Sequence, residues 1–257
     1  MLTAIWNYRS FVLGSVKSDF QHKYCKSVLG AIWVTINPLY MIAIYTVIFS
    51  NVIRPDLHNF SYPIYVAAGS LTWNFFTEII NRSQTVYLSY ANIIKKLNFP
   101  HLCLSIIVVA NAWISFLIAF GLFTIYLLAT SHFPGWCFIA LLPVLIVQTL
   151  LAVGLGTFLG VLNIFFRDVG QAMGVILQIW FWLTPIVYVS QSLPNKVQAL
   201  IKFNPVTPLI NAYHEILVFQ HWPSWSSLFF PLVLALLFCY LSASFYRKYL
   251  IEILDEL

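Results

Sequence analysis

Apolar residues along this chain come in long runs, and short polar stretches separate the runs. A helix rises 1.5 Å per residue, so about 20 apolar residues cross a bilayer core of about 30 Å. Six stretches reach this length with few charged residues inside them. They predict six transmembrane helices, at about residues 29–53, 62–86, 101–130, 136–164, 169–188 and 228–246.

The fifth predicted helix has recognisable signals at both ends. Asp168 is followed three residues later by Gln171, which is typical of a capping box that satisfies the free N–H groups of a first helical turn. At the other end, Pro185 follows Thr184. Proline lacks a backbone N–H group, so we expect the helix to kink or end there.

Two segments outside the spans are predicted to be surface helices. Residues 1–28 place their apolar side chains on one arc, which indicates an amphipathic helix in the plane of the membrane. Lys17 and Asp19 interrupt this segment, which argues against a signal peptide. Residues 86–99 carry one apolar stripe at helical spacing before Pro100, so they predict a short helix on the membrane surface.

Residues 190–226 are too apolar for a free loop, and prolines divide them into short pieces. Two of these pieces, 194–203 and 206–219, are each predicted to form a helix. Their length of about 10 to 14 residues suits re-entrant helices rather than spans.

The composition agrees with a membrane protein. The chain is 61% hydrophobic and only 8% charged, whereas soluble domains carry about 25% charged residues. The four cysteines have no paired spacing and the six histidines form no ligand pattern, so we expect no disulfide framework, no metal and no cofactor in this chain. The expected fold is an all-α polytopic membrane protein with one transmembrane domain over residues 1–257.

Two features inside the spans have a direct physical consequence. Glu78 and Arg82 are four residues apart, so they can pair on one helix face; they are either a self-paired couple near the membrane surface or the lining of a hydrated cavity. Gly154, Gly156 and Gly160 are small enough to let another helix approach closely.

Basic residues are distributed unevenly between the two sides of the six-span arrangement, and such residues favour the cytoplasmic side. Three lie on one side, at Arg54, Lys196 and Lys202. Ten lie on the side of the termini, at Arg9, Lys17, Lys23, Lys26, Arg82, Lys95, Lys96, Arg167, Arg247 and Lys248. We therefore predict cytoplasmic termini and a 190–226 segment on the outer, periplasmic side.

Several motifs resemble one family over almost the whole chain. The segment 19–30, then Trp33 and Asn37-Pro38, is similar to the N-terminal segment of polysaccharide-exporting ABC transporter permeases. The second half carries that family's pattern at Arg167, Asp168, Gln171, Thr184, Pro185, Ile186, Asn204 and Pro205. Two positions depart from it, because Lys23 and His214 stand where relatives often carry arginine.

The resemblance implies a permease that exports lipid-linked O-antigen through a homodimer in the bacterial inner membrane. Two copies of a separate ATPase would bind ATP and Mg²⁺, and an undecaprenyl-diphosphate-linked glycan would pass to the periplasm. Membrane lipids would surround the dimer, and no nucleic-acid partner is expected. The 86–99 helix would couple to the ATPase through Asn92, Lys95 and Lys96. Aromatic side chains would line the glycan path, at Trp180, Trp182, Tyr188, Trp73 and Trp33.

The absence of any Walker A motif in the sequence independently argues against ATP hydrolysis by this chain. Alternatives are a permease for teichoic acid, capsule, a drug or a lipid, and a secondary transporter, which would more often show inverted repeats and intramembrane charges. A membrane-embedded transferase would need clustered acidic or histidine residues at one membrane face, and the eight acidic residues are spread along the chain.

Overall fold

A computed structural model of the chain describes residues 8–24, 44, 61–96, 101–190, 193–249 and 252–253. Every regular element in these residues is a helix, which confirms the all-α class. In chain order the helices are α2 (Arg9–Tyr24), α5 (Tyr62–Ser89), α6 (Ala91–Lys96), α7 (His101–Ala129), η2 (Gly135–Ala140), α8 (Leu141–Phe165), α9 (Asp168–Leu183), α10 (Asn195–Lys202), α11 (Thr207–Leu217), η4 (Trp225–Leu228) and α12 (Phe229–Lys248).

Three segments in the described part of the chain are long and apolar enough to cross a membrane, at Cys103–Ala129, Gly135–Phe165 and Trp225–Lys248. Helix α5 has 28 residues but is more polar. Helix α9 has 16 residues, about 24 Å of rise, which is less than the bilayer core. The predicted span at 29–53 lies outside the described residues apart from Ile44, so six spans stay a prediction.

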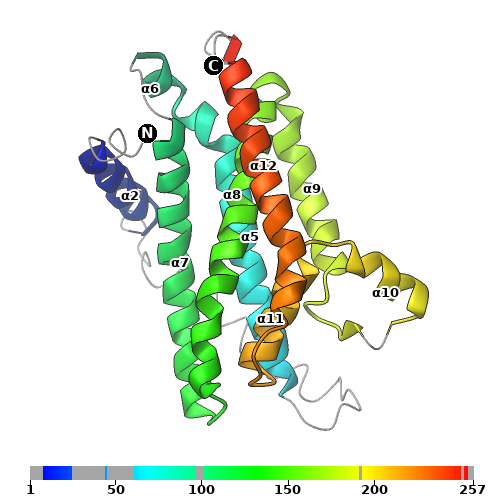
Figure 1. Ribbon diagram of the computed structural model, residues 1–257. Helices are drawn as coiled ribbons and strands as arrows, with labels where there is room; N and C mark the ends of the chain where they lie inside the picture. The colour runs from blue at the N-terminus through cyan, green and yellow to red at the C-terminus, as the bar shows by residue number, and fades with distance from the viewer. Residues whose placement is uncertain are drawn as a thin grey trace.

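Helix α5 occupies the centre of the bundle. It packs against α7, α8, α9 and α11, while α12 runs along the other side of α8. Helix α6 and the end of α12 lie at the same end of the bundle, and α11 lies toward the opposite end (Figure 1). Helix α10 projects sideways from the bundle (Figure 1). This layout puts the predicted surface helix α6 and the predicted re-entrant helix α11 toward different ends.

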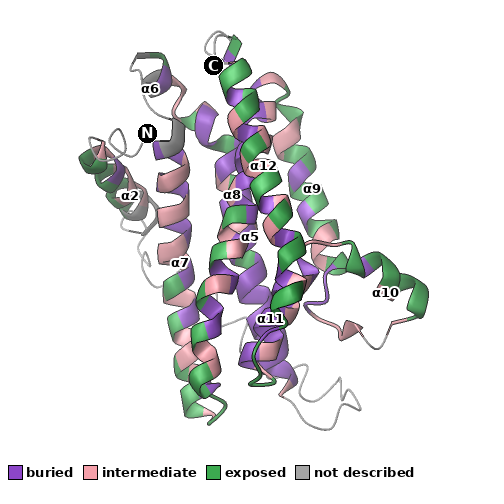
Figure 2. Cartoon of the chain, in the orientation of Figure 1, coloured by how far each residue is buried: buried purple, intermediate pink, exposed green. Residues whose placement is uncertain are grey.

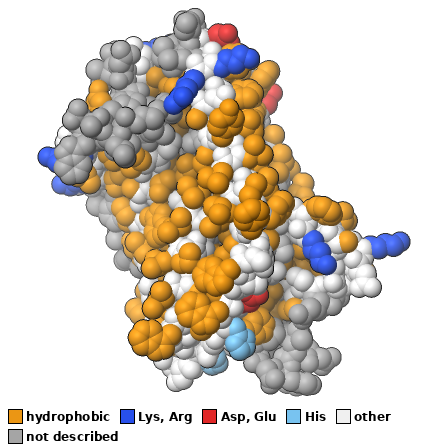
Figure 3. All heavy atoms as spheres, viewed as in Figure 1, with side chains coloured by type: hydrophobic (Ala, Val, Ile, Leu, Met, Phe, Trp, Pro, Cys, Tyr) orange, Lys and Arg blue, Asp and Glu red, His pale blue; other side chains and the backbone are white. Residues whose placement is uncertain are grey.

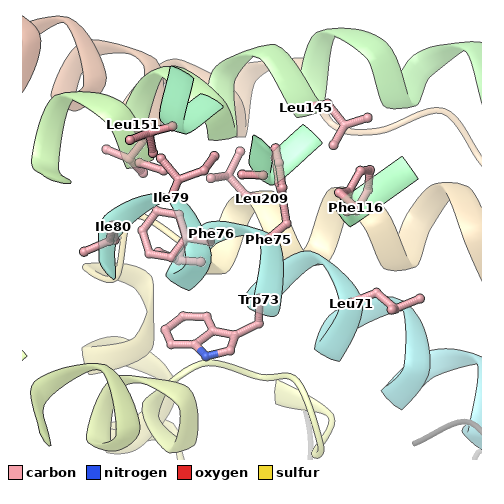
Figure 4. Close-up of a cluster of buried hydrophobic side chains, with 14 of the residues drawn as sticks. Leu71, Trp73, Phe75, Phe76, Ile79, Ile80, Phe116, Leu145, Leu151 and Leu209 are labelled. Atoms are coloured by element: carbon pink, nitrogen blue, oxygen red, sulfur yellow. The ribbon is translucent and has the colours of Figure 1, made fainter. Parts of the chain in front are cut away.

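Burial separates inner from outer helices. Helices α5 and α11 are mostly buried, whereas α9 and α12 each leave one face exposed and α10 is exposed over most of its length (Figure 2). Around α5, Phe75 and Trp73 point to different sides (Figure 4). Phe75 packs on Phe116 of α7, with ring centroids 4.6 Å apart, whereas Trp73 and Phe76 both pack on Trp180 of α9.

The glycines of α8 allow close packing on two sides. An added Cβ at Gly156 would lie 2.7 Å from Cβ of Ser83 in α5, and one at Gly160 would lie 2.6 Å from the Ser83 carbonyl oxygen. At Gly154 it would lie 2.9 Å from the backbone nitrogen of Cys239 in α12. The predicted close approach is confirmed, and it serves two neighbouring helices.

The predicted surface helices differ from the observed ones in their bounds. Helix α5 continues to Ser89, and the short helix α6 covers only Ala91–Lys96. No proline or glycine interrupts the chain between residues 86 and 89, so α5 has no reason to stop at the predicted end of the span. Of the predicted 1–28 helix, the described part is α2, which packs against α7. Its placement in the membrane plane stays a prediction.

The proline-divided segment forms the two short helices that its sequence predicts, α10 and α11. Pro194 immediately precedes α10, and Pro208 lies in the first turn of α11, where a missing N–H group costs nothing. Their depth in the membrane stays a prediction.

Candidate functional site

A ring of hydrogen bonds around Asn204 holds the end of α9 to the loop before α11. The indole N–H of Trp180 donates to Asn204 Oδ1 at 2.8 Å, and Asn204 Nδ2 donates to the Thr184 hydroxyl at 2.9 Å. The Thr184 hydroxyl donates in turn to the Trp180 carbonyl oxygen at 2.8 Å. The Val206 N–H also donates to Asn204 Oδ1, at 3.0 Å. Because these polar groups satisfy one another's hydrogen bonds, they hold the end of α9 and the loop before α11 in one arrangement.

The turn after α9 is also held by the beginning of α5. The Tyr65 hydroxyl lies 3.2 Å from the carbonyl oxygens of both Pro185 and Tyr188. The Tyr62 hydroxyl donates to the Val187 carbonyl. Helix α9 does end at Leu183, with Thr184 as its C-cap, as the Thr184-Pro185 pair predicts. Two tyrosines therefore replace the backbone partners that a continuing helix would have supplied.

His214 is buried beneath this turn, with only 2% of its surface exposed. Its ring stacks on Tyr65 with centroids 3.6 Å apart, and its Nε2 lies 3.1 Å from the Tyr65 carbonyl oxygen. Burial lowers the pKa of His214 to about 3, against the opposing effect of this hydrogen bond. The imidazole is therefore neutral, and this position offers no positive charge to an anion.

The tryptophans and the tyrosine predicted to line a path occupy different environments. Trp73 is 5% exposed and packs edge-on against Trp180, with ring centroids 6.2 Å apart. Trp182 is 66% exposed, and the half-buried Tyr188 donates its hydroxyl to the Trp182 carbonyl at 3.0 Å. Trp33 lies outside the described residues. In this chain Trp73 and Trp180 support the fold, and Trp182 is the ring open to contact.

Helix α9 packs on α5 and α8 through one face and leaves the other open. Only Met173 and Leu177 of this helix are buried. Gln171 and Gln178 are exposed, and amide side chains are unfavourable in lipid. Its exposed large apolar residues are Val175, Ile176, Ile179, Trp182 and Leu183. A face that mixes glutamines with apolar groups suits another protein surface or a polar path better than lipid alone.

At the other end of α9 the predicted capping box is wrong. Asp168 is the first residue of the helix rather than its N-cap. The N-cap residue is Arg167, and its side chain makes no capping hydrogen bond. Instead Asn163, at the end of α8, accepts the N–H of Gly170 on its Oδ1 at 3.1 Å. The turn between α8 and α9 brings this amide to the first turn of α9, so it takes the role predicted for Asp168. Arg167, Asp168 and Gln171 are exposed.

The residues predicted to couple to an ATPase lie on α6, immediately after α5. Lys95 is exposed. The backbone of α6 includes Asn92 and Lys96, whose side chains lie outside the described part of the structure. The helix lies at the same end of the bundle as the end of α12, where Arg247 and Lys248 are exposed. Figure 3 shows Lys and Arg side chains at this end of the molecule, and further ones on α2 and on the projecting α10.

Polar groups also join α2, α5 and α7. The predicted Glu78–Arg82 pair forms, with 3.1 Å between Arg82 Nε and Glu78 Oε1, and Ser115 of α7 lies 3.5 Å from the same oxygen. The two side chains are 24% and 29% exposed. A second hydrogen bond between helices was not predicted from the sequence: Asn111 of α7 donates to Asp19 of α2 at 3.0 Å. No local signal reveals a contact between residues 92 positions apart.

Within the described residues, no group of histidine, cysteine, aspartate or glutamate side chains could hold a metal ion. The site is instead a set of helix ends, an open helix face and a short surface helix.

Comparison with protein families decides the class. A family model described as "ABC-2 type transporter" matches residues 12–218.

The chain belongs to the ABC-2 type transporter family.

Curated relatives support the same assignment. An O-antigen export system permease protein RfbA of Myxococcus xanthus is 23% identical over 218 residues, covering 84% of this chain and 83% of that protein. Two proteins of the same name from Klebsiella pneumoniae are 27% and 28% identical over 199 residues, covering 77% of this chain and 76% of each relative. As an ABC-2 transporter protein the chain is a multi-pass membrane permease rather than an enzyme, and its ATPase is a separate subunit. Family membership also argues against a secondary transporter or a transferase.

Proposed function

We propose that this chain is the permease subunit of an ABC transporter that exports lipid-linked O-antigen across the bacterial inner membrane to the periplasm. The observation that carries the proposal is the relatives' shared name, O-antigen export system permease, over about four-fifths of the chain. The substrate would be a glycan on undecaprenyl diphosphate. The permease would hold it, and ATP with Mg²⁺ would bind only to the partner ATPase.

The open face of α9 supports a dimeric path. Two copies that meet near this face would shield Gln171 and Gln178 from lipid and bring two exposed Trp182 rings toward one conduit. Aromatic faces offer apolar contact to sugar rings without reading their sequence. A homodimer with a central path is therefore our proposed assembly.

Charge distribution supports the proposed orientation. Arg247, Lys248 and Lys95 lie at the end of the bundle that carries α6, and basic residues favour the cytoplasmic side. The ATPase, two copies per dimer, would dock there against α6. The two helices α10 and α11 would face the periplasm.

Deletion of the gene tests the proposal most directly. Loss of the long-chain O-antigen ladder, with core lipopolysaccharide retained and the ladder restored by the gene, is the expected result. A purified complex with the ATPase from the neighbouring reading frame should hydrolyse ATP, whereas the permease alone should not. An unchanged ladder, together with loss of capsule or of another envelope polymer, would reassign the substrate. Turnover of ATP by the permease alone would contradict the proposed division of labour.

A further inference from the structure

Two buried amide side chains fasten α8 to α5, one in each half of the bundle. Gln148 donates to the Thr72 carbonyl oxygen at 2.7 Å, and Asn163 donates to the Gln84 carbonyl oxygen at 2.9 Å. Their exposed fractions are 0% and 3%. A buried amide that has its partners resists separation of the helices, since a vacated partner would stay unsatisfied.

The two amides differ in the third element that they reach. Gln148 Oε1 accepts the hydroxyl of Tyr213 in α11. Asn163 Oδ1 accepts the N–H of Gly170, in the first turn of α9. This N–H belongs to the groups that a helix cannot satisfy by itself. One planar amide thus joins the end of α8, the end of α5 and the beginning of α9.

The position of Gln84 makes this junction informative. Gln84 lies seven residues before Ala91, where α6 begins, which is about two helical turns. Beside it, Ser83 lies in close contact with Gly156 and Gly160 of α8. The last turns of α5 and α8 are therefore closely packed, and a displacement of α6 would be carried into both. Asn163 is placed to pass that displacement to α9.

We propose that Asn163 is a positioning residue that transmits movement of α6 to α9 and so couples ATP hydrolysis to export. This inference rests on the proposed function. It assigns Asn163 no contact with the glycan or with ATP. Its two hydrogen bonds have separate roles: the bond to Gln84 receives the movement, and the bond to Gly170 delivers it.

Two substitutions separate transmission from simple capping of α9. Asn163→Asp keeps an oxygen for the Gly170 N–H. In its carboxylate form, which is favourable at a helix N-terminus, it has no donor for the Gln84 carbonyl. Asn163→Leu has a similar shape and loses both bonds. If Asn163 only caps α9, the aspartate variant keeps its function and the leucine variant loses stability. If Asn163 transmits movement, both variants lose coupling.

The matched control is Gln148→Leu. It removes a buried side-chain hydrogen bond between the same two helices, α5 and α8, and does not touch α9. Each variant is expressed with the partner ATPase in the deletion strain. Ladder intensity is normalised to the amount of assembled complex, and the ATPase rate and the thermal midpoint are measured on purified complex. We expect both Asn163 variants to keep ATPase activity within about twofold while export per ATP falls about tenfold, the factor that one lost buried hydrogen bond corresponds to. Gln148→Leu should lower the thermal midpoint at an unchanged export per ATP.

A distance measurement provides a readout independent of export. Spin labels are placed at Lys95 in α6 or at Val175 in α9. For each position, the distance between the two labels of the dimer is measured with and without a non-hydrolysable ATP analogue. In the wild type both distances should change, and in the Asn163 variants only the Lys95 distance should change. Normal export by both variants, or a proportional fall of export and ATPase activity, overturns the inference while the proposed function stands. A wild-type complex that neither hydrolyses ATP nor exports overturns both.

Discussion

The indole N–H of Trp180 donates to Asn204 at 2.8 Å and joins residues 24 positions apart in the chain. Through this bond the end of α9 is tied to the loop between α10 and α11, and Asn204 passes the connection on to Thr184. The bond explains why Trp180 is held in place, while Trp182, two residues later, is exposed.

The ring of hydrogen bonds predicts graded effects on stability. Trp180→Phe removes one donor and should lower the thermal stability of detergent-solubilised protein by about 1 kcal/mol. Asn204→Leu leaves the Trp180 N–H and the Val206 N–H without their acceptor and removes the donor to the Thr184 hydroxyl, which still donates to the Trp180 carbonyl. Its cost should therefore be larger, about 1–3 kcal/mol per group left buried and unsatisfied. Equal melting curves for the two variants would contradict this account.

Two tryptophans should respond differently to alanine. Trp73 is 5% exposed in the core, so Trp73→Ala should destabilise the fold by about 3–5 kcal/mol and lower the amount of inserted protein. Trp182 is 66% exposed, so Trp182→Ala should leave the melting curve nearly unchanged and reduce the O-antigen ladder. A Trp182→Ala variant with a normal ladder would show that this ring meets lipid instead.

The close approach of α5 and α8 predicts opposite effects for two glycines. An alanine at Gly160 would place its Cβ 2.6 Å from the Ser83 carbonyl oxygen, so Gly160→Ala should destabilise the fold by about 1–3 kcal/mol. Gly121 in α7 has no atom within 4 Å of an added Cβ. Gly121→Ala should therefore be neutral or stabilise by about 0.5–1 kcal/mol. Thermal unfolding of the two variants side by side is the measurement.

The topology can be tested with single cysteines. Asn195 is exposed at the beginning of α10, on the side with few basic residues. In a background where Cys103, Cys137 and Cys239 are replaced by alanine, we expect an impermeant maleimide to label Asn195→Cys in intact cells. Native Cys25 should react only after the membrane is opened. Labelling of Cys25 from outside would reverse the proposed orientation.

The coupling role of α6 makes a further prediction. A cysteine at Asn92 should crosslink to the partner ATPase, and Lys95→Glu with Lys96→Glu should lower export more than membrane insertion. Lys95 is exposed, so the charge reversal should cost little folding stability. If Asn92→Cys reacts only with lipid-phase reagents and the double variant exports normally, α6 is a membrane-surface helix without a coupling role.

Local signals in the sequence determined the elements of this protein. The apolar runs require a membrane because so few charges are available to form a soluble surface. Thr184-Pro185 ends α9 because proline lacks the N–H group that would continue it, and Glu78 pairs with Arg82 because four residues make one helical turn. In each case the cause lies within a few neighbouring residues.

Contacts between distant residues were decided by the tertiary structure. In a membrane helix both the buried and the lipid-facing sides are apolar, so periodicity alone does not reveal that Trp73 lies in the core and Trp182 at the surface. The cap of α9 comes from Asn163 rather than from Asp168, because the turn after α8 brings the Asn163 amide to the Gly170 N–H. The same amide reaches Gln84, 79 residues away, and only the packing of α5 against α8 makes that bond possible.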